Sequence, residues 1–195
     1  MKRVLCLISC MNTGGAETFL MKIYRQIDKT KYQMDFGVNI QQKGFYDDEI
    51  IASGGRIYYI PPKSSNVKEY KRQLGTVIRK EKYEVVLRIT SSAAGFLDLK
   101  VAKKAGVKRC CARSSNSSDG GSVLSVIAHR MGRVLYGKYV DVKIAPSDLA
   151  AKYTFGKKAY DNHEVHILHN AVDTSIFQYK EDYRSKIRNE LALKK

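Results

Sequence analysis

The feature that most constrains the fold of this sequence is its alternation between short β-branched, apolar runs and longer stretches with helical periodicity. The short runs predict strands and the longer stretches predict amphipathic helices, a rhythm typical of βαβ units and a parallel sheet. The sequence therefore predicts an α/β, doubly wound, mainly parallel sheet with helices on both faces. We expect its strands at residues 3–9, 34–40, 56–60, 85–89, 110–114, 142–146 and 165–168.

Four stripes of apolar residues at helical spacing lie between these strands. A helix on the surface of a globular domain usually turns such a stripe towards the core. The tail at 179–195 also predicts a helix, but Ile187 and Leu191 give it only a narrow apolar face. It either packs on the surface at the end of the domain or begins a connection to a further part. The four stripes are Phe19, Ile23 and Ile27; Tyr70, Leu74, Val77 and Ile78; Leu97 and Val101; and Val123, Ile127, Met131, Val134 and Leu135.

Size and charge bound the possible functions. The 195 residues, 44% of them hydrophobic, suffice for one well-buried domain. The net charge of +16 favours anionic partners such as phosphates, nucleic acid or an acidic membrane surface, although a solvated basic surface explains it equally well. A membrane span needs about 18–20 consecutive apolar residues and a secretory leader needs a small-residue cleavage pattern. The sequence has neither, so we expect a cytoplasmic protein.

The turn after the first predicted strand, NTGGAE at residues 12–17, is the first candidate site. In an α/β fold this turn delivers the N-terminus of the next helix, whose free N–H groups and dipole attract anions such as phosphate. Gly14 and Gly15 permit close approach of a ligand to the backbone, or serve a tight turn alone. Glu17 is placed to favour the helix dipole, and near a cleft it could accept hydrogen bonds from a sugar hydroxyl.

Several other site types find no support in the sequence. The glycine turn is neither GxGxxG nor GxxxxGK[ST], which argues against a nicotinamide dinucleotide or a P-loop nucleotide. The four histidines and four cysteines show no metal-ligand spacing, so we expect no metal. The Ser/Gly-rich loop 113–122 follows the fifth strand, where doubly wound sheets build their ligand cleft, but it could equally be a linker. Ser147 is placed to cap the helix after the sixth strand.

The order of five segments resembles that of family 4 glycosyltransferases, above all the bacterial capsule and surface-polysaccharide members. The segments are MNTGGAETFLMKIYRQID, KGFYDDEIIASGGRIYYIPP, KKAGVKRCCARSSNS, APSDLAAKYTFG and ILHNAVDTSIF. The resemblance implies the GT-B architecture, in which two Rossmann-like domains face each other across the active site. Residues 1–178 correspond to the N-terminal, acceptor-side domain and 179–195 to the start of the interdomain connection. The C-terminal, donor-binding domain has no counterpart in this sequence.

Matched position by position, the resemblance places a donor-diphosphate and acceptor cleft on nine residues. Asp173 matches the end of a further N-x-x-D segment that begins at Asn170. Histidines that many family members carry at the ends of strands four and five are not matched, so the resemblance gives no catalytic residue. The nine cleft residues are Gly14, Gly15, Glu17, Arg113, Ser114, Ser115, Asn116, Ser147 and Asn170.

The resemblance implies a retaining transfer from a nucleotide-diphosphate sugar to a saccharide acceptor, often linked to polyprenyl diphosphate. The nucleotide sugar is then a substrate, and neither cofactor nor metal is expected. The basic charge would hold the protein at the anionic inner face of the membrane. Three alternatives stay open: a nucleotide-sugar 2-epimerase, a non-catalytic acceptor-binding partner subunit, and a basic nucleic-acid-binding domain. We expect no nucleic acid, because most tyrosines lie in apolar periodic segments rather than along a basic stripe.

Overall fold

The computed structural model describes residues 1–118, 122–175 and 177–193. Its centre is a parallel sheet of seven strands in the order β3-β2-β1-β4-β5-β6-β7. The predicted fold class is confirmed, and every strand end lies within two residues of its predicted position. The strands are β1 Lys2–Ile8, β2 Tyr32–Val38, β3 Ile57–Tyr59, β4 Val85–Thr90, β5 Arg109–Ser114, β6 Val142–Ala145 and β7 Val165–Ile167.

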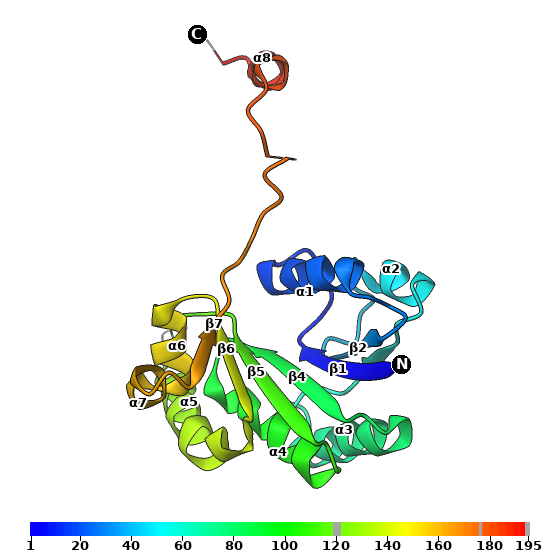
Figure 1. Ribbon diagram of the computed structural model, residues 1–195, viewed down its shortest axis with the longest axis vertical. Helices are drawn as coiled ribbons and strands as arrows, with labels where there is room; N and C mark the ends of the chain where they lie inside the picture. The colour runs from blue at the N-terminus through cyan, green and yellow to red at the C-terminus, as the bar shows by residue number, and fades with distance from the viewer. Residues whose placement is uncertain (119–121, 176, 194–195) are drawn as a thin grey trace.

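Helices cover both faces of the sheet (Figure 1). In β1, Leu5 and Leu7 belong to the core beneath α3, α4 and α6, whereas Cys6 and Ile8 belong to the core beneath α1 and α2. Since alternate residues of a strand point to opposite faces, this one strand contributes to both cores. The helices are α1 Gly15–Gln26, α2 Asp47–Ala52, α3 Val67–Glu81, α4 Phe96–Lys104, α5 Val123–Tyr136, α6 Asp148–Phe155, α7 Lys157–Asp161 and α8 Glu181–Glu190, with short 3-10 turns η1 Ala93–Gly95 and η2 Gly137–Tyr139.

The strand order reverses direction between β1 and β4, which are hydrogen-bonded neighbours. After β1 the chain continues to β2 and β3, towards one outer strand of the sheet. After β4 it continues to β5, β6 and β7, towards the other outer strand, so the connections after β1 and β4 diverge. In doubly wound sheets a crevice at this point, beyond the carboxyl ends of the strands, is the usual ligand site. The glycine turn at 12–15 follows β1 after three residues and therefore lies at this crevice.

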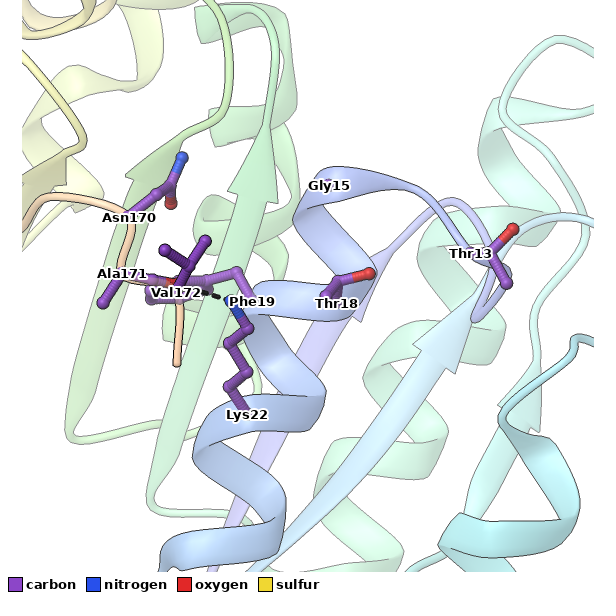
Figure 2. Close-up of a pocket in the computed structure, with 8 residues that line it drawn as sticks. All are labelled: Thr13, Gly15, Thr18, Phe19, Lys22, Asn170, Ala171 and Val172. Carbon is purple, nitrogen blue, oxygen red and sulfur yellow. Dashed lines mark hydrogen bonds between the residues drawn. The ribbon is translucent and has the colours of Figure 1, made fainter. Parts of the chain in front are cut away.

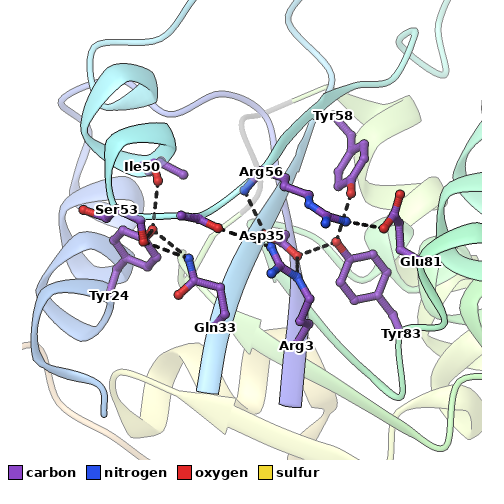
Figure 3. Close-up of polar contacts among 11 residues, drawn as sticks. Arg3, Tyr24, Gln33, Asp35, Ile50, Ser53, Arg56, Tyr58, Glu81 and Tyr83 are labelled. Atoms are coloured by element: carbon purple, nitrogen blue, oxygen red, sulfur yellow. Dashed lines mark hydrogen bonds and ion pairs between the residues drawn. The ribbon is translucent and has the colours of Figure 1, made fainter. Parts of the chain in front are cut away.

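A buried polar network closes the opposite, amino edge of the sheet (Figure 3). The Asp35 carboxylate on β2 accepts hydrogen bonds from the Arg3 Nε at 2.6 Å, the Tyr83 hydroxyl at 2.5 Å and the Arg56 backbone N–H at 2.8 Å. Arg56 in turn pairs with Glu81. These contacts join the first three strands to the segment before β4. The polar groups of this network are thus paired with one another within the domain.

The prediction for the fourth apolar stripe was wrong in one respect. Residues 123–136 do form helix α5, but Val123, Met131 and Val134 are exposed rather than packed against the sheet. The buried residues of α5 are instead His129 and Gly132, a polar and a small residue that the apolar pattern does not detect.

The chain after β7 leads away from the domain towards α8 (Figure 1). The predicted helix in the tail is present, and both Ile187 and Leu191 are exposed. Of the two expectations for this segment, packing on the surface of the domain therefore does not occur in the described structure.

Candidate functional site

The glycine pair begins helix α1 without any need for a left-handed backbone. Gly14 is the N-cap in extended conformation, with φ −74° and ψ 166°, and its carbonyl accepts the first helical hydrogen bond from Thr18 at 2.9 Å. Among the described glycines, only Gly54, Gly106 and Gly156 have positive φ. A tight turn that only glycine can adopt is therefore not the reason for the pair.

Open space beside Gly15 points to the other explanation. A Cβ atom built on Gly15 meets no heavy atom of the described residues within 4 Å, apart from its chain neighbours and its own helix. The space belongs to a cavity of about 330 Å³ at the carboxyl edge of the sheet. Backbone without a side chain therefore faces this cavity at the N-terminus of a twelve-residue helix, where free N–H groups and the helix dipole favour an anion. The cavity is lined by Gly15, Ala16, Glu17, Arg113, Ser115, Pro146 and Asn170.

Arg113, at the end of β5, supplies a buried cation to this cavity. The residue is only 2% exposed, and its guanidinium lies over the Phe19 ring, 3.6 Å from the centroid. One terminal nitrogen donates to Asn170 Oδ1 at 2.7 Å, while Nε has no hydrogen-bond partner in the described structure. Within the described residues Arg113 forms no ion pair with a carboxylate. Burial lowers the pKa of Arg113, which indicates that its charge is not compensated.

Glu17 lies in the first turn of α1, where it packs against the glycine turn and lines the cavity. Its carboxylate crosses Gly14 so closely that a Cβ on Gly14 would lie 2.4 Å from Oε2. The Cys10 thiol donates to Glu17 Oε1 at 3.6 Å, and burial, more than Glu17, raises the pKa of this thiol. This position is compatible with both expected roles of Glu17, the helix dipole partner and the hydroxyl acceptor.

The alternation of strand β5 separates the other candidates of the 113–116 segment. Arg113 and Ser115 line the cavity, whereas Ser114 points to the opposite side and shares a 2.6 Å hydrogen bond with Thr154. Asn116 is exposed and bonds within its own loop, to Ser118. The remainder of the predicted loop, residues 119–121, lies outside the described residues.

The last three candidates lie at the ends of β6 and β7. Ser147 caps α6 as predicted, accepting a hydrogen bond from Ala150 N at 3.3 Å. It does not line the cavity. Asn170 reaches the cavity and positions Arg113. Asp173 is exposed and accepts from Ser175 in its own turn. The structure thus brings Gly15, Glu17, Arg113, Ser115 and Asn170 together, with Gly14 beside them.

A second cavity, of about 250 Å³, adjoins the first one through Gly15 and Asn170 (Figure 2). Here the segment 170–172 lies alongside α1, and the Lys22 ammonium donates to the Ala171 carbonyl. Sequence reasoning missed Lys22, and it assigned Phe19 only to a core stripe. One signal in the sequence could have identified them. Phe19 and Lys22 follow Gly15 by four and seven residues, and this spacing places Gly15, Phe19 and Lys22 along one side of α1.

No group of three or more His, Cys, Asp or Glu side chains within the described residues is arranged to hold a metal ion. The cavity is lined by the backbone at the start of α1, the Arg113 cation, the Glu17 carboxylate and the polar side chains of Ser115 and Asn170. Chemically, it can bind an anionic group and hydroxyl groups at the same time.

Sequence comparison finds a curated relative. No protein-family model matches the chain. The chain is 33% identical over 180 residues to the Bacillus subtilis (strain 168) protein named "Putative glycosyltransferase EpsF", an alignment that covers 90% of this chain and 47% of the relative. The chain therefore spans about half the length of this relative.

Solved structures share the fold at low sequence identity. Anabaena Alr3699/HepE, solved in complex with UDP and glucose, covers 98% of this chain with a TM-score of 0.71 at 14% identity. A glycosyltransferase from Rickettsia africae ESF-5 covers all of it with a TM-score of 0.70 at 10% identity, and S. aureus MnaA, solved with UDP, does so with a TM-score of 0.63 at 20% identity. This chain spans 50%, 50% and 51% of the three solved chains, respectively.

Proposed function

We propose that this chain, a GT-B glycosyltransferase domain, forms one wall of a cleft in which a nucleotide-diphosphate sugar donates its sugar to a saccharide acceptor. The observation that carries the proposal is the open backbone of Gly15 at the N-terminus of α1, facing the same cavity as the uncompensated Arg113. Both groups favour negative charge. Two relatives of this fold were solved with UDP, which supports a nucleotide diphosphate as the anion.

The chemistry that follows is stabilisation of a leaving group. When the sugar departs, negative charge grows on the nucleoside diphosphate, and donors that are already in place stabilise that charge without reorganisation. The helix N-terminus and Arg113 are such donors. Glu17, Ser115 and Asn170 can accept or donate hydrogen bonds to sugar hydroxyls and hold donor and acceptor together.

The finer parts of the proposal rest on the family resemblance. We propose a retaining transfer, no metal, and an acceptor linked to a lipid diphosphate in bacterial capsule or surface-polysaccharide synthesis. The net charge of +16 supports a location at an anionic membrane surface. The whole protein would provide the remaining contacts to the nucleotide from its second domain.

The test is ligand-observed NMR of the chain with UDP, GDP and ADP. Gly15→Ala places a methyl group in the cavity, and Gly137→Ala is its matched control because a Cβ there also meets no described atom within 4 Å, apart from its chain neighbours and its own helix. We expect one of the nucleotides to bind, and Gly15→Ala to weaken it about tenfold, the equivalent of about one charge-assisted hydrogen bond. Gly137→Ala should bind like the wild type.

Two results would contradict the proposal. If Gly15→Ala binds as well as the wild type, the nucleotide does not approach this turn. If the intact protein converts a UDP-sugar to its epimer without any acceptor, the domain belongs to an epimerase rather than a transferase.

A further inference from the structure

Helix α5 presents a continuous apolar surface to solvent, which we call the α5 face. Its members are 47–78% exposed. Large apolar side chains that are exposed singly are common, but a contiguous patch of them usually marks an interaction site. The α5 face consists of Val123, Leu124, Ile127, Met131, Val134 and Leu135.

The way α5 is anchored explains why this face stays open. Gly132 packs so tightly on η1 that a Cβ would lie 2.4 Å from the Ala93 carbonyl oxygen. Beside it, His129 accepts from Ala93 N at 3.2 Å and stacks on the Tyr153 ring with centroids 4.3 Å apart. A small and a polar residue thus hold the helix to the domain. The large apolar residues are not needed for this packing, so they remain available.

The charged side chains of α5 itself have a single sign. Between Val123 and Tyr136 there is no Asp or Glu. Arg130 lines a shallow depression of about 280 Å³ together with Met131, Val134 and Leu135. The α5 face therefore combines an apolar strip with one lining cation, Arg130.

The face also has a fixed position relative to the candidate site. Helix α5 follows β5, which ends beside the cavity at Arg113, and its buried contacts are with η1 at the carboxyl end of β4 (Figure 1). Both the cavity and the anchor of α5 therefore lie at the carboxyl edge of the sheet. A surface that binds α5 comes close to the opening of the site.

We propose that the α5 face docks the domain onto an anionic lipid bilayer, with its apolar side chains among the lipids and Arg130 at the headgroups, in a chain whose net charge is +16. An amphipathic helix with apolar and basic residues binds such an interface by both effects. None of the described helices is long and apolar enough to cross a bilayer, so the contact is one of surface binding. A second copy of the chain is a poorer occupant, since a two-fold interface over this face would bury Arg130 of both copies with no Asp or Glu of α5 to pair with it.

This inference rests on the proposed function in one respect: docking would bring the site to a lipid-linked acceptor. Binding to vesicles requires no nucleotide or sugar. A failure of nucleotide binding and a failure of membrane binding can therefore be told apart.

The first experiment is flotation with phosphatidylcholine vesicles, with and without phosphatidylglycerol. Leu124→Asp/Val134→Asp changes two exposed members of the α5 face, 76% and 78% exposed. Ile51→Asp/Val67→Asp, at exposed positions of α2 and α3, is the matched control with the same charge change. We expect binding to the anionic vesicles, a loss of at least about tenfold in the first variant and a change below about threefold in the control.

The second experiment uses the absence of tryptophan from the sequence. Ile127→Trp places a single indole on the α5 face and Ile51→Trp places one on α2. Anionic vesicles should shift the emission of the first indole to shorter wavelength and leave that of the second unchanged.

Three outcomes overturn the proposal. Equal loss of vesicle binding in both aspartate variants would mean that net charge acts without α5. Absence of vesicle binding by the wild type would exclude the bilayer. Light scattering that shows a dimer, dissociated by Leu124→Asp/Val134→Asp alone, would make the α5 face an interface between copies.

Discussion

The guanidinium of Arg113 lies over the ring of Phe19, 3.6 Å from its centroid. The two residues come from β5 and α1, so this contact joins the helix after the glycine turn to a strand on the other side of the crevice between β1 and β4. Phe19 and Asn170 fix the direction of the guanidinium without neutralising it. An oriented and uncompensated buried cation is costly for a protein to maintain, which is why we assign it a ligand.

Arg113→Met should separate binding from stability. We expect nucleotide affinity to fall about tenfold or more, since a charge-assisted contact is lost. Unfolding in urea should show a loss of no more than about 1 kcal/mol, because removal of an unpaired buried charge offsets the lost contacts. Arg109→Met, at the exposed start of the same strand, is the control and should bind nucleotide normally. A loss of stability of about 3–5 kcal/mol would instead identify Arg113 as a structural residue.

Gly132→Ala tests the anchor of helix α5. The new methyl group would meet the Ala93 backbone, which cannot move aside as a side chain could. We expect urea denaturation to show a loss of about 1–3 kcal/mol, the usual cost of overpacking. Gly137→Ala, in open space, should unfold like the wild type. Equal stability of the two variants would show that α5 is not held closely against η1.

Tyr83→Phe tests the network at the amino edge. Burial, and then the hydrogen bond to Asp35, raise the pKa of Tyr83. The folded state therefore favours the neutral phenol. The contribution of Tyr83 to the free energy of unfolding is complete below the ordinary tyrosine pKa of about 10 and is lost as the pH rises beyond that value. At neutral pH the variant should be about 1–2 kcal/mol less stable, since buried Asp35 loses a donor.

The pH dependence provides the check on this prediction. Urea denaturation of both proteins from about pH 8 to 11 should show their stabilities converging as the pH rises. Phenylalanine does not titrate, so the difference between the two curves isolates Tyr83. A constant difference would contradict the assigned cause of the pKa shift.

Sequence periodicity predicted the fold well because strand β1 and its neighbours are buried on both faces, and such runs are hard to mistake. It failed for α5 because periodicity detects an apolar side of a helix but not which side meets the protein. There the packing side consists of His129 and Gly132. In the site, the 113–116 segment was treated as one block, whereas the strand alternation turns Ser114 away from Ser115. The contact between Arg113 and Asn170 spans 57 positions and leaves no trace in local spacing.

The final prediction concerns activity. The cavity beside Gly15 lies at the carboxyl ends of the strands, and the chain spans about half the length of relatives such as the Bacillus subtilis protein and Anabaena Alr3699/HepE. We therefore expect the 195 residues to unfold cooperatively in urea, yet to transfer no sugar from UDP-, GDP- or ADP-sugars to lipid-linked acceptors. A radiolabelled donor and thin-layer chromatography would detect transfer. Sustained turnover by these residues alone would show that one domain completes the site, because donor and acceptor would then be held without a facing wall.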